Sequence, residues 1–286
     1  MKRALFYIFV ALVFCVAACA PKHGEDIGDK ALLAVSIPPQ AALLEAIAGD
    51  DYDIVTLLPR GADPESYDPT PGTRRSVADA DAFFITGAFP FEEAVASSLS
   101  DNVTVVDGSE GVELIYDTHG CDGAGHSHAD PHIWTSVRNM RLMASGMAAE
   151  LSALRPDRAE IYSSRLDSLN GVLDSLDTEI AATLAASSSS AFAVRHPSLS
   201  YFARDYGLRQ HALGMEGKEM STRGLRAMID AARADSVTVL FVDAPDQKER
   251  ITTIADGIGA RIVVINFLEP DWQSQLKAVA DAISGS

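Results

Sequence analysis

Cysteine is scarce in this chain, with only three among 286 residues. They are Cys15, Cys19 and Cys121. Cys121 has no second cysteine at the spacing of a zinc finger, so a structural zinc site is not expected. If residues 1–18 are removed and Cys19 is modified, as argued below, only Cys121 keeps a thiol. No intramolecular disulfide could then form.

Basic residues are also in short supply. Lysine and arginine total 23 against 40 aspartates and glutamates, which gives a formal net charge of −17. Such a surface repels a phosphate backbone, so binding to nucleic acid is not expected. The surplus of acid is compatible with attracting cations, although solubility alone also accounts for it.

A long apolar run occurs only near the N-terminus. Residues 4–16 follow the basic residues Lys2 and Arg3 and are too few to span a bilayer as a stable helix. This order is typical of a signal peptide. The small residues before Cys19 resemble the lipobox of bacterial lipoproteins, in which that cysteine is acylated. We therefore predict a lipoprotein signal peptide at 1–18 and a polar tether at 19–30, with an ordinary signal peptide as the alternative.

Short apolar runs alternate with helical patterns from residue 31 onward. The first lobe, 31–136, is predicted to contain strands at 31–37, 52–58, 82–86 and 103–107 and helices at 40–48, 73–80 and 91–99. The second lobe, 188–286, is predicted to contain strands at 191–195, 210–213, 238–242 and 261–265 and helices at 198–206, 222–233, 247–257 and 272–283. Strands that alternate with helices pair in parallel through right-handed crossovers. Each lobe is therefore expected to be an open α/β parallel sheet.

The middle segment, 137–187, has a helical pattern throughout. Pro156 separates a first helix from a second one, because proline disfavours helical geometry in the residue before it. In the second helix, Ile161 is followed by apolar residues that recur every three or four positions, at Leu166, Leu169, Leu173, Leu176, Ile180 and Leu184. This stripe predicts one helix of about 28 residues and about 42 Å, which exceeds what a crossover needs. We expect a rigid spine that joins the lobes. A coiled coil is the alternative, and the stripe is short for one.

Candidate metal ligands lie in loops near the predicted strand ends, where ligands bind in open α/β sheets. They are Glu65, His132, His196 and, as a weaker oxygen donor, Asn266. Two imidazoles and a carboxylate suit Zn²⁺ or a neighbouring divalent ion. Taken singly, each has a simpler interpretation as a solvated acid, a core histidine or a helix cap. Their shared location favours a metal site in the cleft between the lobes.

Four of the seven histidines fall within residues 119–132. His119, His126 and His128 stand in a glycine-rich stretch beside Cys121, ahead of His132. Glycine gives such a loop high conformational entropy, so a preformed site there is not expected. We predict either an accessory loop that makes weak, exchangeable metal contacts or a solvated loop without a role.

Four motifs follow one another along nearly the whole chain after the signal segment: GADPESYDPTP at 61–71, DPHIW at 130–134, HPSLSYFARDYGL at 196–208 and MEGKEMS at 215–221. In this order and at these separations they resemble the cluster A-I metal-binding proteins of bacterial ABC transporters. These proteins are zinc and manganese receptors, and the zinc-uptake receptors are the most similar. The resemblance implies two α/β lobes joined by one long rigid helix, with the metal held between the lobes.

The resemblance also assigns ligands residue by residue. The family's histidines fall on Glu65, His132 and His196, and its acidic fourth ligand falls on Asn266. The chain thus departs from the pattern at Glu65 and Asn266. Carboxylate in place of imidazole favours Mn²⁺, whereas a histidine-bearing loop is typical of the zinc receptors. Zn²⁺ is favoured as the transported ligand, with Mn²⁺ kept open.

Together these features predict a solute-binding lipoprotein of the periplasm, anchored by lipid to a bacterial membrane and monomeric. It would capture Zn²⁺ and deliver it to an ABC transporter permease in the inner membrane, without being an enzyme. The alternatives are a manganese receptor of the same fold, a metal-dependent hydrolase and a surface adhesin. Two histidines and a carboxylate can also activate water, but no His-Glu-x-x-His pattern supplies a base. No repeat supports an adhesin.

Overall fold

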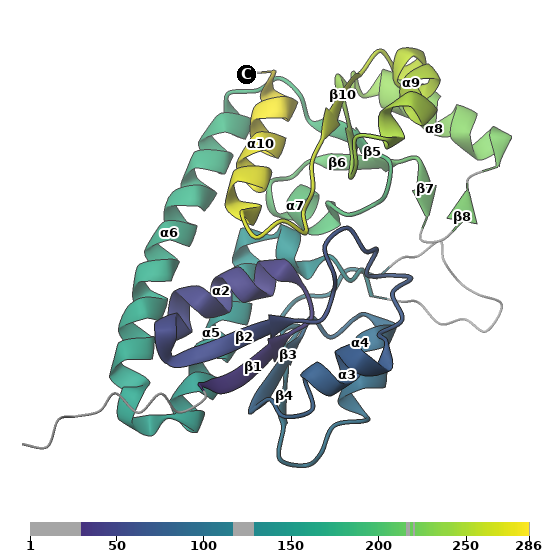
Figure 1. Ribbon diagram of the computed structural model, residues 1–286. Coiled ribbons are helices and arrows are strands. Elements are labelled where there is room, and N and C mark those ends of the chain that lie inside the picture. Colours follow the sequence, from purple (N-terminus) through teal and green to yellow (C-terminus); the bar gives the residue numbers. More distant parts are fainter. Residues whose placement is uncertain (1–29, 117–128, 216–217, 220, 286) are drawn as a thin grey trace, which may run out of the picture. The chain divides into compact units, whose positions relative to one another are not determined.

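Figure 1 shows the computed structural model, which describes residues 30–116, 129–215, 218–219 and 221–285. Residues Ala31–Ser286 form one compact unit. The described residues of this unit form two four-stranded parallel sheets and one short two-stranded sheet. No helix among the described residues is long and apolar enough to cross a membrane.

The first sheet has the strand order β2-β1-β3-β4, and all its pairs are parallel. Its strands are β1 (Ala31–Val35), β2 (Tyr52–Thr56), β3 (Ala82–Ile85) and β4 (Thr104–Asp107). The helical elements between them are α2 (Pro38–Ala48), η1 (Gly49–Asp51), α3 (Pro71–Ser76) and α4 (Pro90–Ala96). Each α-helix starts with proline, whose missing N–H costs nothing in the first turn of a helix.

The second sheet has the order β10-β9-β5-β6 and is also parallel throughout. Its strands are β5 (Ala191–Val194), β6 (Arg209–Ala212), β9 (Val239–Val242) and β10 (Arg261–Val264). The helices are α7 (Ser200–Asp205), α8 (Thr222–Ala234), α9 (Gln247–Ile258) and α10 (Trp272–Ser284). In both sheets the chain adds its second strand on one side of the first, then its third strand on the other side. A ligand crevice is expected at that reversal, beyond the carboxyl ends of the strands.

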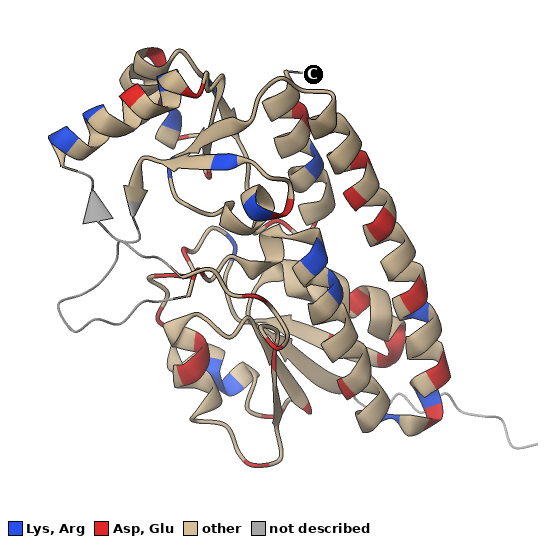
Figure 2. Ribbon diagram, turned by 180° about the vertical axis from the view of Figure 1, so that it is seen from behind, with Lys and Arg blue, Asp and Glu red and all other residues tan. Residues whose placement is uncertain are grey.

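The long spine helix α6 (Ala159–Ala185) follows α5 (Val137–Leu154) and the short turn η3 (Pro156–Arg158). It packs against α2 of the first lobe, against α5 of its own segment and against α10 of the second lobe (Figure 1). A single hydrophobic core contains residues of both sheets, and a smaller one lies under α8 and α9. Figure 2 shows acidic residues along the exposed side of α6. The predicted fold of two α/β lobes and a long joining helix is confirmed.

Some local predictions were wrong. Ile161 is 38% exposed and lies outside the buried stripe of α6, where Tyr162 is buried instead. Helices α3 and α4 end sooner than expected, because the chain tightens into turns bonded three residues back, such as Ala78 N to Arg75 O. The antiparallel pair β7 (Gly214–Met215) and β8 (Lys218–Glu219) lies where no strand was predicted.

Asp51 links the first lobe to the spine helix and gives a testable effect of pH. Its carboxylate accepts hydrogen bonds from Arg158 at 2.8 Å and from Tyr162 at 3.0 Å. Burial raises the pKa of this carboxyl, but these partners outweigh burial and hold the pKa below its usual range. A depressed pKa contributes stability above the unfolded pKa, and that stability is lost as pH falls through the folded pKa.

Asp51→Asn should therefore lower the free energy of unfolding by about 2 kcal/mol at pH 7. The difference from wild type should shrink as pH falls below about 4. Urea unfolding at pH 7 and pH 3 measures both values, with the exposed Asp53→Asn as the matched control. If the free energy of unfolding of Asp51→Asn lay below that of wild type by the same amount at both pH values, this account would be contradicted.

Candidate metal centre

Glu65 is carried by the loop that follows β2. The carboxylate of Asp63 accepts a hydrogen bond from Glu65 N at 3.0 Å and another from the hydroxyl of Ser66 at 2.9 Å. Aspartate favours such turns because its side chain replaces a backbone acceptor. Tyr67 secures the loop to the sheet by donating to the carbonyl of Leu57 at 3.2 Å. The turn places the side chain of Glu65 half-buried toward the second lobe.

His132 comes from the segment that enters α5, through the short helix η2 (Ile133–Thr135). The residue is 4% exposed. One oxygen of Asp130 accepts both the backbone N–H of His132 at 2.9 Å and its Nδ1 at 2.8 Å. This contact assigns the proton to Nδ1 and leaves the lone pair of Nε2 for a metal. Burial raises the pKa of Asp130, but the hydrogen bonds from His132 outweigh it, so the pKa lies below its usual range.

His196 lies two residues after the end of β5 and belongs to the second lobe. Its ring meets that of His132 edge-on, with 4.9 Å between the ring centroids. The backbone of this turn is held by a hydrogen bond from Ser198 N to the carbonyl of His196 at 2.7 Å. His196 thus lies at the crevice where the order of strands reverses in the second sheet.

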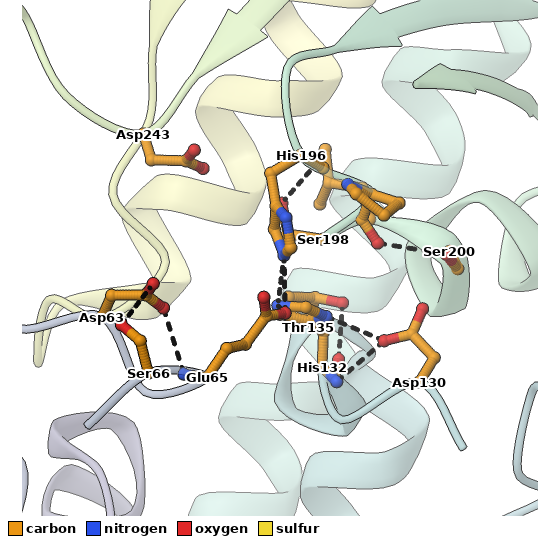
Figure 3. A network of polar contacts seen from close by, with 12 residues as sticks. Asp63, Glu65, Ser66, Asp130, His132, Thr135, His196, Ser198, Ser200 and Asp243 are labelled. Atoms are coloured by element: carbon orange, nitrogen blue, oxygen red, sulfur yellow. Dashed lines mark hydrogen bonds and ion pairs between the residues drawn. The ribbon is translucent and has the colours of Figure 1, made fainter. Parts of the chain in front are cut away.

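The three side chains converge on one point (Figure 3). The Nε2 atoms of His132 and His196 are 3.1 Å apart, and His196 Nε2 lies 3.0 Å from Glu65 Oε1. His132 Nε2 lies 3.9 Å from the same oxygen. Ligand atoms about 2.0–2.1 Å from a tetrahedral ion lie about 3.3 Å from one another. The triangle therefore has nearly the size of one face of a zinc coordination tetrahedron.

The environment of Glu65 also fits a cation. Its Oε1 is buried and lies 3.9 Å and 3.0 Å from the Nε2 atoms of His132 and His196, but it has no aligned hydrogen bond within the described part of the chain. Buried carboxylate oxygens are normally satisfied by donors or metals. The donor set of two nitrogens and one oxygen leaves further coordination positions open toward the adjoining cavity.

That cavity has a volume of about 380 Å³ and is lined by both lobes. Asn266, the predicted weaker oxygen donor, is one of its lining residues. Its amide donates to Glu269 Oε1 at 3.0 Å, and its carbonyl accepts from Leu268 N at 3.0 Å. Both ends of the amide are thus bonded within its own loop. The structure brings Glu65, His132 and His196 together and places Asn266 on the cavity wall.

Asp243 is a cavity residue that the sequence reasoning missed. It follows β9 directly, beside the turn that carries His196, and it lines the same cavity (Figure 3). Burial raises the pKa of its carboxyl, while His196, Arg195 and His132 act in the opposite direction. The strand-end rule could have found it, because the apolar run of β9 ends at this aspartate.

Several predicted residues lie outside the described parts of the chain. They are the lipidation candidate Cys19, the thiol of Cys121, and the accessory loop residues His119, His126 and His128. Their predicted roles stay predictions.

A protein-family model described as zinc-uptake complex component A, periplasmic (ZnuA), matches residues 33–285. The chain belongs to this family. A solved crystal structure of ZnuA shares 33% sequence identity, with a TM-score of 0.81 over 90% of this chain and 99% of that one. The resemblance to the zinc and manganese receptors inferred from the four motifs is thereby confirmed.

Curated relatives of this ZnuA-family chain include receptors named for each metal. It is 25% identical over 284 residues to the high-affinity zinc uptake system protein ZnuA of Bacillus subtilis, covering 94% of this chain and 89% of that protein. It is 27% identical over 277 residues to the manganese ABC transporter substrate-binding lipoprotein PsaA of Streptococcus mitis, covering 89% and 86%.

Proposed function

We propose that this protein is the extracytoplasmic receptor of an ABC transporter, which captures Zn²⁺ and delivers it to the permease for uptake. The observation that carries the proposal is the triangle of two imidazole nitrogens and one carboxylate oxygen, with sides of 3.1, 3.0 and 3.9 Å. Membership of the ZnuA family supports the same function and disfavours the hydrolase and adhesin alternatives.

Each residue has a distinct role in this proposal. His132 and His196 supply neutral nitrogens, and Glu65 supplies an anionic oxygen that neutralises half of the ion's charge. Asp130 orients His132 and increases its basicity as a ligand. The fourth position faces the cavity, where Asn266, Asp243 or a water could complete the coordination sphere.

Manganese is the second candidate because Glu65 replaces one imidazole by a carboxylate. Oxygen ligands suit Mn²⁺, whereas imidazole nitrogens suit Zn²⁺. A given site also generally binds Zn²⁺ more tightly than Mn²⁺. With two nitrogens and one oxygen, the site favours zinc. The two curated relatives, one named for each metal, are consistent with either ion.

The anchoring and assembly of the protein are also part of the proposal. We propose that Cys19 is acylated after removal of residues 1–18, that residues 19–30 are a tether, and that the receptor acts as a monomer. The lobe boundaries of 31–136 and 188–286 around the segment 137–187 are proposed on the same basis. Residues 119, 126 and 128 would act as an accessory collecting loop.

Metal content and thermal stability test the proposal. A metal that binds only the folded state raises the free energy of unfolding by about 2.7 kcal/mol at a hundredfold excess over the dissociation constant. We therefore expect the melting temperature of untagged, metal-free protein to rise on addition of Zn²⁺, and less on addition of Mn²⁺. Elemental analysis of the purified protein should show about one equivalent of metal. A melting temperature that neither ion changes would contradict the proposed function.

A further inference from the structure

Tyr201 is a buried residue of α7 whose hydroxyl contacts the backbone on both sides of residues 117–128. The side chain is fully buried. Its hydroxyl donates to the carbonyl of Asp130 at 2.8 Å and accepts the backbone N–H of Ile115 at 3.3 Å. Asp130 N in turn donates to the carbonyl of Ile115 at 2.7 Å, and Tyr116 pairs with Ala129 beside them. One hydroxyl thus fixes two backbone segments of the first lobe.

The chain of contacts continues from Asp130 into the metal centre. Asp130 accepts the Tyr201 hydroxyl on its carbonyl. On its carboxylate it accepts the Nδ1 and the backbone N–H of His132. Tyr201 lies five positions after His196, on the helix that follows that ligand. Tyr201 therefore connects the segment carrying one imidazole to the segment carrying the other.

We infer that Tyr201 is a positioning residue for metal binding, which sets the distance between His132 and His196 through Asp130. The inference rests on the proposed function, because it presumes that these histidines are ligands. A site whose ligands are already spaced for the ion binds more tightly, since binding then costs less reorganisation. Loss of the Tyr201 hydroxyl should let the Asp130 segment shift and should weaken the metal site without removing a ligand.

Tyr201→Phe isolates the hydroxyl because the ring and its contacts remain. The guanidinium of Arg204 lies 5.1 Å from the ring centroid, a contact that phenylalanine keeps. Burial raises the pKa of Tyr201 to about 12, so the hydroxyl is protonated at any working pH. The substitution therefore changes hydrogen bonding and no charge.

Tyr206→Phe is the matched control. Tyr206 closes the same helix, and its hydroxyl donates to Asp177 on the spine helix at 2.7 Å. Removing it also deletes a hydroxyl and a hydrogen bond, but none of its described partners contacts a proposed ligand. Any loss of affinity that follows from general loosening of this helix should appear in both variants.

Zn²⁺ affinity is measured by competition with a chelating dye at pH 7.5, and bound Co²⁺ reports the coordination through its visible absorption. Outer partners of metal ligands typically contribute about 10–100-fold to affinity, so we expect about a tenfold loss in Tyr201→Phe and less than twofold in Tyr206→Phe. The Co²⁺ spectrum should change only in Tyr201→Phe. Equal affinities in the two variants would overturn the inference and leave the proposed function intact. Absence of metal binding in the wild type would instead overturn the proposed function.

Wild-type protein provides a second measurement if Tyr201→Phe does not fold. Metal binding should strengthen the hydrogen bond between His132 and Asp130 and, through Asp130, the contacts of the Tyr201 hydroxyl. Because that hydroxyl accepts the Ile115 amide, this amide should then be protected from hydrogen exchange. Thr73, whose amide bonds Thr70 at the start of α3, serves as the reference amide. If addition of Zn²⁺ slows exchange of the Ile115 amide by a larger factor than exchange of the Thr73 amide, the inference is supported. Equal changes at both amides would overturn it.

Discussion

Replacing His132 by alanine should lower the affinity for Zn²⁺ at least about a hundredfold. Structural zinc sites with four ligands are worth about 10–16 kcal/mol, so one ligand contributes about 3 kcal/mol. That difference corresponds to more than a hundredfold in affinity, because each ~1.4 kcal/mol is a factor of ten. His132 should show the full effect, since Asp130 and its burial hold it in a single orientation.

His196→Ala should lose affinity to a similar extent, and Glu65→Ala should lose it too, because its oxygen completes the triangle. Elemental analysis and dye competition measure these losses. His211→Ala is the control, because this histidine pairs with Asp235 at 2.7 Å and does not line the cavity. Metal retained in Glu65→Ala would show that Glu65 is not a ligand. Metal retained in both histidine variants would exclude this site.

Glu92→Gln should lower the free energy of unfolding by about 3 kcal/mol. Glu92 is 1% exposed, near the start of α4. Its carboxylate accepts hydrogen bonds from five donors, which are the backbone N–H and hydroxyl of Thr86 and the N–H groups of Gly87, Ala88 and Phe89. Burial raises the pKa of this carboxyl, and these hydrogen bonds oppose the rise. Glutamine offers one acceptor oxygen, so several buried N–H groups would face an NH₂ group instead.

Equilibrium urea unfolding of the metal-free protein measures this effect. Glu93→Gln is the matched control, because Glu93 is the next residue of the same helix and is exposed. Exposed substitutions of this kind usually change stability by less than about 0.5 kcal/mol. If the two variants differed by less than about 1 kcal/mol, the five hydrogen bonds would not stabilise the fold as argued.

Local patterns were sufficient for much of the fold. The alternation of apolar runs and helical stretches predicted both parallel sheets, and the leucine stripe predicted α6 nearly to its ends. The errors came at a single residue and at very short elements. Ile161 stands five positions before Leu166, whereas Tyr162 stands four before it, at the spacing of the stripe, and Tyr162 reaches Asp51 and occupies the buried position. The two-residue strands β7 and β8 are too short to leave a periodic signal.

The sequence by itself determined the kinds of side chain at the candidate site and the loops that carry them. These depend on residue type and on strand ends, both of which are local. Only the tertiary structure decided that Glu65, His132 and His196 converge within about 4 Å. It also revealed the cavity position of Asp243 and the contacts of Tyr201. Such distances join residues far apart in sequence, and the packing of two lobes around one core sets them.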